Sequence, residues 1–143
     1  MSKQELEQLN DRALAAWDAH DPDAFADTLA EDVVWYDWTL PEPIHGKAGA
    51  KQYFGSWVAA FPDMHTKNVV TLVGDDGIAS EIEWTGTNTG PLVMAGAELP
   101  PTNKTVTGRG SYIARVRNGK IVEFRAYQDA PGLMMQLGLM PQL

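Results

Sequence analysis

Asp129 is the carboxylate whose position in the sequence most favours a chemical role. It follows an alternating apolar stretch and precedes Ala130-Pro131-Gly132, so we expect it at the end of a strand. A carboxylate in an apolar pocket has its anionic form destabilised, which makes it a better base. Aspartate also caps helices by accepting a hydrogen bond from a backbone N–H, and the position fits that role equally.

The turn before this strand predicts which side chains accompany Asp129. Asn118-Gly119 is a strong signal for a two-residue hairpin turn, and such a turn pairs Arg117 with Lys120. Side chains then alternate between the two faces of each strand. We therefore predict one face that lines the interior and carries Tyr112, Glu123, Arg125, Tyr127 and Asp129.

Two features leave this assignment open. A bulge near Gly108 or Gly110 would shift the alternation by one residue. Arg125 and Glu123, two residues apart on the same predicted face, also fit an ion pair with a purely structural role.

Aromatic residues are numerous for a core of this size, and aromatic side chains commonly line pockets for flat ligands. They also fill cores and interfaces, and both roles fit each of them. The candidate ligand-binding residues are Trp35, Asp37, Trp57, Trp84, Asn88, Tyr112, Arg125 and Tyr127.

Composition and motifs exclude several classes of chemistry. The chain has no cysteine and its three histidines lack partners at helical spacing, so we expect no metal site. It has no glycine-rich nucleotide-binding loop and no Gly-x-Ser-x-Gly. We therefore expect no cofactor and no serine hydrolase chemistry.

The charge balance and hydropathy narrow the possible partners. The formal net charge of −8 repels phosphate backbones and anionic membrane surfaces. No apolar run of about 18 residues and no signal-peptide core are present, so we expect a cytoplasmic protein without nucleic-acid or membrane partners. Six basic residues lie within 104–125, which fits either a site for an anionic ligand or a solvated outer sheet face.

The hydrophobic pattern predicts helices first and strands afterwards. Apolar residues at helical spacing predict helices at about residues 3–18, 22–29 and 46–60. Residues 90–103 are predicted to cross irregularly between two hairpins, and 133–137 to form a short terminal helix. Alternation and β-branched residues predict strands at 33–38, 67–73, 78–87, 105–117 and 120–129.

This order of elements indicates the fold class. The 143 residues suffice for one domain, 1–143, in which three N-terminal helices pack on a curved, mostly antiparallel sheet. A bent sheet covered by helices on its concave side forms a cone with an interior. Glycines in the strands suit the bulges that bend such a sheet.

Short segments spread over nearly the whole chain occur in a characteristic order. They are Asp32-Val33-Val34-Trp35, Ile44-His45-Gly46, Ala60-Phe61-Pro62-Asp63, Gly86-Thr87-Asn88-Thr89-Gly90, Pro100-Pro101-Thr102, Gln128-Asp129-Ala130-Pro131-Gly132-Leu133 and Gln136-Leu137-Gly138. Together they resemble the SnoaL-like polyketide cyclase family of the nuclear-transport-factor-2-like superfamily.

The resemblance implies a cone-shaped α+β fold, usually as a homodimer, and a cofactor-free intramolecular aldol condensation. The catalytic aspartate of the characterised cyclases lies at the end of the last strand, and Asp129 matches it. The resemblance thus implies proton transfer next to a carbonyl of a hydrophobic substrate, with Asp129 as general acid/base. Asn88 stands where the family often has histidine, and Gln128 where an aromatic residue commonly precedes the aspartate.

Other functions also fit the sequence. A ketosteroid-isomerase-like enzyme performs a related proton transfer, and a limonene-epoxide-hydrolase-like enzyme needs an Asp–Arg–Asp set, for which Asp129, Arg125 and Asp37 are available. A non-catalytic module that binds small hydrophobic molecules needs only the interior. We also expect a homodimer through the outer sheet face, whose predicted apolar residues include Ile113, Val122 and Phe124.

Overall fold

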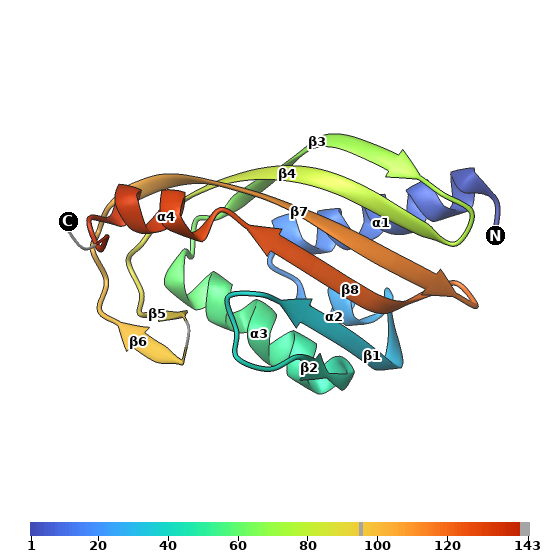
Figure 1. The fold of residues 1–143 in the computed structure, drawn as a ribbon, viewed down its shortest axis with the longest axis horizontal. Coiled ribbons are helices and arrows are strands. Elements are labelled where there is room, and N and C mark those ends of the chain that lie inside the picture. The colour runs from blue at the N-terminus through green and yellow to red at the C-terminus, as the bar shows by residue number, and fades with distance from the viewer. Residues whose placement is uncertain (95, 141–143) are drawn as a thin grey trace.

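The computed structural model describes residues 1–94 and 96–140 and confirms the predicted α+β architecture (Figure 1). The helices are α1 (Lys3–Asp18), α2 (Pro22–Ala26), α3 (Gly46–Ala60) and α4 (Ala130–Leu137). The strands are β1 (Leu29–Asp37), β2 (Ile44–His45), β3 (His65–Val73), β4 (Gly77–Thr87), β5 (Leu92–Met94), β6 (Ala97–Leu99), β7 (Thr105–Arg117) and β8 (Lys120–Gln128).

A curved sheet with the strand order β2-β1-β8-β7-β4-β3 forms the frame of the molecule. β1 and β8 run parallel, and the other neighbouring pairs in this sheet are antiparallel. The long strands β4, β7 and β8 curve over α1 and α3, which cover the inner, concave face (Figure 1). β5 and β6 pair only with each other and form a small separate ribbon.

Local capping explains where the first two helices begin. Ser2 Oγ accepts a hydrogen bond from the Glu5 N–H at 3.1 Å, and the Glu5 carboxylate accepts one from the Ser2 N–H at 3.2 Å. This reciprocal pair is a capping box, which satisfies two N–H groups at the start of α1. Asp21 caps α2 with a single hydrogen bond, which its Oδ1 accepts from the Ala24 N–H at 3.0 Å.

Some predicted bounds differ from the structure, and two of the differences have identifiable reasons. The second helix was expected to reach residue 29, but the Thr28 hydroxyl donates to the Phe25 carbonyl at 2.6 Å and Leu29 already begins β1. The expected irregular crossing at 90–103 contains the ribbon β5–β6. Its strands have three residues each, too few for a two-residue period to be recognised.

A bulge in β8 reverses the predicted faces of its second half. Val116 pairs with Ile121 but Arg115 pairs with Glu123, so Val122 is an extra residue. Beyond Val122, the inward-facing residues are Phe124, Ala126 and Gln128, and the outward-facing ones are Arg125 and Tyr127. The predicted inward placement is therefore wrong for Glu123, Arg125 and Tyr127, and Asp129, which follows the strand, is exposed and absent from the cavity wall. The bulge lies near the turn and no glycine marks it.

Two apolar cores fill the space between the helices and the sheet. The larger lies under α1, α2 and α3 and centres on side chains such as Leu9, Trp35 and Phe54. The smaller joins α3, α4 and the ribbon through Trp57, Leu133 and Leu92. Within the described residues, no helix has the length and apolar character needed to cross a membrane.

Candidate active site

A cavity of about 90 Å³ lies between the inner face of the sheet and helices α1 and α3. Its walls are mainly aromatic and include Trp17, Trp35, Trp57, Trp84 and Phe124. Polar side chains reach it in two groups, one from Asp37, Tyr53 and Gln128 and the other from Asn10 and Tyr112. Apolar walls with a few polar groups are typical of sites for small organic molecules.

Small residues in the sheet explain why the inner face is hollow here. Ala126 pairs with Asp37 on one side and with Tyr112 on the other. Two residues further along β8, on the same face, Gln128 pairs with Gly110. The floor between the larger side chains thus consists of a methyl group and bare backbone, which leaves room for a ligand.

Trp84 forms part of the wall because its partner across the sheet is a glycine. Trp84 pairs with Gly108, and a Cβ added to Gly108 would lie 2.1 Å from the indole. Only glycine permits this close approach of the ring to the backbone.

Asp37, the last residue of β1, is the buried carboxylate of the cavity and is only 3% exposed. Its Oδ2 accepts hydrogen bonds from Gln128 Nε2 at 2.7 Å and from the Tyr53 hydroxyl. Its Oδ1 accepts from the N–H and the hydroxyl of Thr39, at 2.9 and 2.7 Å.

No lysine, arginine or histidine of the described residues forms an ion pair with Asp37. Burying a carboxylate without a cation costs free energy, which the four donors offset. An unpaired buried carboxylate that faces a cavity is a strong candidate for a functional group.

The Tyr53 hydroxyl lies between Asp37 and Gln128. It donates to Asp37, and Gln128 Nε2 lies 3.2 Å from its oxygen. Burial and, next, the charge of Asp37 raise the pKa of Tyr53 far above its ordinary value. Tyr53 is therefore protonated at neutral pH and serves as a hydrogen-bond donor, not as a base.

The second polar group centres on Asn10, which is 1% exposed on the apolar face of α1. Its Nδ2 donates to Ser80 Oγ at 3.1 Å and lies 3.5 Å from Thr71 Oγ1. The Tyr112 hydroxyl donates to Asn10 Oδ1. Burial raises the pKa of Tyr112 to about 12, so this phenol is also protonated at neutral pH.

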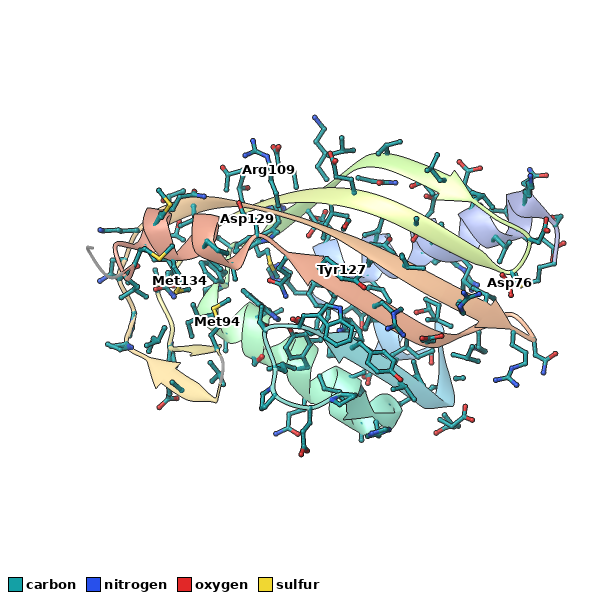
Figure 2. All side chains as sticks on the ribbon, viewed as in Figure 1. Asp76, Met94, Arg109, Tyr127, Asp129 and Met134 are labelled. Carbon is teal, nitrogen blue, oxygen red and sulfur yellow. The ribbon has the colours of Figure 1, made fainter. Side chains whose placement is uncertain are left out.

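Asp129 lies outside this cavity, at the N-cap of α4. Its Oδ1 accepts a hydrogen bond from the Gly132 N–H at 2.9 Å, and its own N–H donates to the Arg109 carbonyl at 3.0 Å. Figure 2 shows Asp129 next to Arg109 near the start of α4. The side chain is exposed and is not part of the cavity wall. It therefore has the capping contact that the sequence left as an alternative, and its catalytic role stays a prediction.

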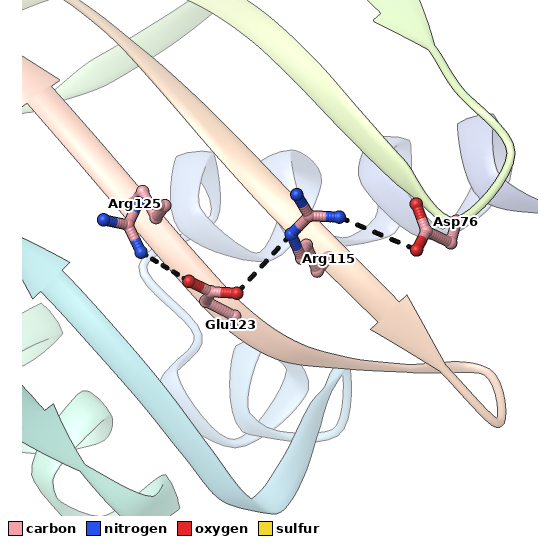
Figure 3. Close-up of polar contacts among 4 residues, drawn as sticks. All are labelled: Asp76, Arg115, Glu123 and Arg125. Carbon is pink, nitrogen blue, oxygen red and sulfur yellow. Dashed lines mark hydrogen bonds and ion pairs between the residues drawn. The ribbon is translucent and has the colours of Figure 1, made fainter.

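Arg125 belongs to a ladder of charges on the outer face (Figure 3). Its Nη1 lies 2.5 Å from Glu123 Oε1, and the second oxygen of Glu123 lies 3.6 Å from Arg115 Nε. Arg115 in turn approaches Asp76 at 3.6 Å. The guanidinium of Arg125 also lies 4.5 Å from the ring centre of Tyr36. Arg125 lies on the outer face of the sheet and Asp37 on the inner face, so the Asp–Arg–Asp set considered above is not assembled.

The other sequence-predicted binding residues divide into two groups. Trp35, Asp37, Trp57, Trp84 and Tyr112 all line the cavity. Tyr127 also borders the cavity, but the residue is 46% exposed, and its ring centre lies 6.1 Å from that of Trp38 on the outer face.

Asn88 was expected to bind ligand, and its contacts are instead structural. The side chain is fully buried, with Nδ2 donating to the carbonyls of Ala60 at 3.3 Å and Gly90 at 2.9 Å. Its Oδ1 accepts from the N–H and hydroxyl of Thr102, at 2.9 and 3.0 Å. Asn88 thus ties α3 to the crossing segment and does not line the cavity.

Among the cavity residues that the sequence did not single out, three take part in its two polar groups, namely Asn10, Tyr53 and Gln128. Asn10 had a detectable signal, because it is a polar residue on the helix face that carries Leu6, Leu9 and Ala13. Tyr53 has the ordinary appearance of a core aromatic residue. Gln128 was assigned to the wrong face because of the Val122 bulge.

Comparison with known proteins identifies the family. The profile of the SnoaL-like polyketide cyclases matches residues 7–137. The chain belongs to this family. Its cone-shaped fold is that of the nuclear-transport-factor-2-like proteins, and the family is one of cyclase-type enzymes. No curated protein sequence matches the chain.

Several solved structures share the fold. AclR from Streptomyces galilaeus, a candidate hydroxylase, is 24% identical with a TM-score of 0.83, covering 99% of this chain and 90% of AclR. A candidate polyketide cyclase from Bacillus cereus is 25% identical with a TM-score of 0.75, covering 96% of this chain and 83% of its own. IdmH from Streptomyces antibioticus, a candidate polyketide cyclase, is 23% identical with a TM-score of 0.74. The match covers 92% of this chain and 97% of IdmH.

Proposed function

We propose that this SnoaL-like protein transfers a proton at a carbon next to a carbonyl group of a small hydrophobic compound. The reaction is an aldol-type cyclisation or a related isomerisation. The observation that carries the proposal is Asp37, a buried carboxylate without a cation partner among the described residues, on the wall of an aromatic cavity. The proposal gives Asp37 the general acid/base role that the family resemblance suggested for Asp129.

The proposed reaction is balanced without an oxidant or reductant. Asp37 takes the proton, and the C–H electron pair remains on the substrate as an enolate. In a cyclisation, the enolate carbon attacks a second carbonyl of the same molecule, a C–C bond forms, and the new alkoxide recovers the proton from Asp37. In an isomerisation, the proton returns to a different carbon.

The donors around Asp37 have defined roles in this proposal. Four hydrogen bonds occupy the carboxylate, so a substrate must displace one of them. Gln128 is the donor that leaves most easily, because its amide keeps a contact with the Tyr53 oxygen. Once Asp37 is protonated it becomes a weaker acceptor, and the Tyr53 hydroxyl is then free to donate to the enolate oxygen.

Hydrogen–deuterium exchange into β-tetralone, followed by proton NMR in heavy water, tests the proposal without knowledge of the natural substrate. We expect the protein to accelerate exchange next to the carbonyl. Asp37→Asn retains the shape of the side chain but not the base, and should slow the catalysed exchange by at least about 10²-fold. Asp129→Asn is the matched control and should exchange at the original rate.

The opposite result would reassign the reaction. A loss of exchange in Asp129→Asn with normal exchange in Asp37→Asn would contradict the proposed role of Asp37. The general acid/base role would then belong to Asp129. Quenching of the cavity tryptophans by β-tetralone without any exchange would favour the non-catalytic binding module.

We further propose that two copies associate through the outer sheet face. One row of this face carries Tyr36, Arg125 and Ile113, and beside it Trp38 is 56% exposed. The ladder of alternating charges is self-complementary under two-fold rotation, which supports a second copy as the partner. Phe124, predicted to contribute here, is buried on the inner face because of the Val122 bulge.

A further inference from the structure

Asp37 and the Asn10 group lie toward opposite ends of one row of inner-face residues. The registers pair Asp37 with Ala126, Ala126 with Tyr112, and Tyr112 with Ser80, which contacts Asn10. Neighbouring strands lie about 4.8 Å apart, so the backbones of Asp37 and Tyr112 are roughly 10 Å apart. The small side chain of Ala126 leaves the middle of this row open to the cavity.

A ligand hydroxyl group can replace the direct hydrogen bond between Tyr112 and Asn10 with two bonds of its own. Both residues line the cavity, and the Tyr112 hydroxyl donates to Asn10 Oδ1. A ligand hydroxyl placed between them accepts from Tyr112 and donates to Asn10 Oδ1. Asn10 Nδ2 keeps its contacts with Ser80 and Thr71, so the amide stays in its present orientation.

We propose that Asn10 and Tyr112 form a second binding position that takes a ligand hydroxyl group, remote from the carbonyl held at Asp37. The carbonyl end rests on the proposed function above. The substrate class is therefore a flat compound with a carbonyl at one end and a hydroxyl at the other.

The size of the cavity narrows this class further. Its volume of about 90 Å³ is well below the roughly 300–1,000 Å³ of sites for drug-sized ligands. Among flat compounds that carry both groups, a hydroxylated bicyclic ketone is one of the smallest, so we choose this class for the test.

Paired binding measurements test this position. The probes are β-tetralone and its analogue with a hydroxyl at the far end of the aromatic ring, with affinity read from quenching of the cavity tryptophans. One added hydrogen-bonded group typically improves affinity up to about tenfold, and we expect that preference for the hydroxylated probe. Tyr112→Phe and Asn10→Leu should abolish the preference while still binding β-tetralone.

Thr71→Val is the matched control, because Thr71 contacts Asn10 but does not line the cavity, and it should retain the preference. Equal affinity of the original protein for both probes, or a preference that survives in Tyr112→Phe, would overturn the proposal. Tyr112→Phe removes a single oxygen and decides the matter if Asn10→Leu does not fold. Binding requires no turnover, so this result is independent of the exchange experiment on Asp37.

Discussion

Gln128 donates a hydrogen bond to Asp37 over 2.7 Å, from β8 to the parallel strand β1. The contact places Gln128 on the inner face of the sheet. The next residue, Asp129, leaves the strand on the other side and caps α4. The residue adjacent to the expected acid thus touches the buried carboxylate, and the two aspartates have different surroundings that separate experiments can distinguish.

The capping contact of Asp129 predicts a stability effect. Asp129→Ala should lower the free energy of unfolding by about 0.5–2 kcal/mol, because the Gly132 N–H loses its acceptor. Asp129→Asn should be close to the original protein, since asparagine also caps helices well. Urea unfolding followed by circular dichroism measures both, and an alanine variant of unchanged stability would contradict the capping role.

Replacing Asn88 should affect the stability of the protein, not the binding of a ligand that the sequence analysis expected. Asn88→Ala leaves the Ala60 and Gly90 carbonyls and the Thr102 donors without their partner. The free energy of unfolding should fall by about 1–3 kcal/mol, while the affinity for β-tetralone stays unchanged. Thermal unfolding and tryptophan quenching on the same samples check the pair of outcomes. A selective loss of affinity would restore Asn88 as a binding residue.

Tyr112 predicts a loss of stability at alkaline pH. Burial raises its pKa from 10.0 to about 12, so the tyrosinate is less favourable in the folded than in the unfolded protein. The resulting stability is complete below about pH 10 and is lost as the pH rises toward 12. Tyr112→Phe lacks this dependence.

The measurement compares the two proteins by urea unfolding at about pH 8 and pH 11. The stability of the original protein relative to Tyr112→Phe should decrease with pH. A difference that stays constant over this range would show that Tyr112 titrates alike in both states.

The proposed contact through the outer sheet face predicts that the protein is a dimer in solution. Light scattering at micromolar concentration should show a dimer, and Ile113→Asp combined with Tyr127→Asp should produce a monomer, because both exposed side chains lie on that face. Val93→Asp, at an exposed apolar position on the ribbon, is the control and should remain dimeric. A monomeric original protein would refute the proposed interface.

The sequence by itself determined the main helices, the long strands and the family. The bounds of α1, α3 and β7 agree with the expected ranges 3–18, 46–60 and 105–117. The Asn118-Gly119 turn pairs Arg117 with Lys120 as predicted. These features depend on hydrophobic periods, prolines and turn residues, which act between residues close in the chain.

Only the tertiary structure decided which carboxylate faces the cavity. The extra residue Val122 changes the face of everything after it in β8, and it depends on how β7 and β8 twist together, not on any local turn signal. Asp37, Tyr53 and Gln128 come from β1, α3 and β8, and meet because β1 pairs in parallel with β8 while α3 packs across them. Contacts between segments this far apart depend on packing and burial of the whole chain, because no short stretch of sequence contains all the partners.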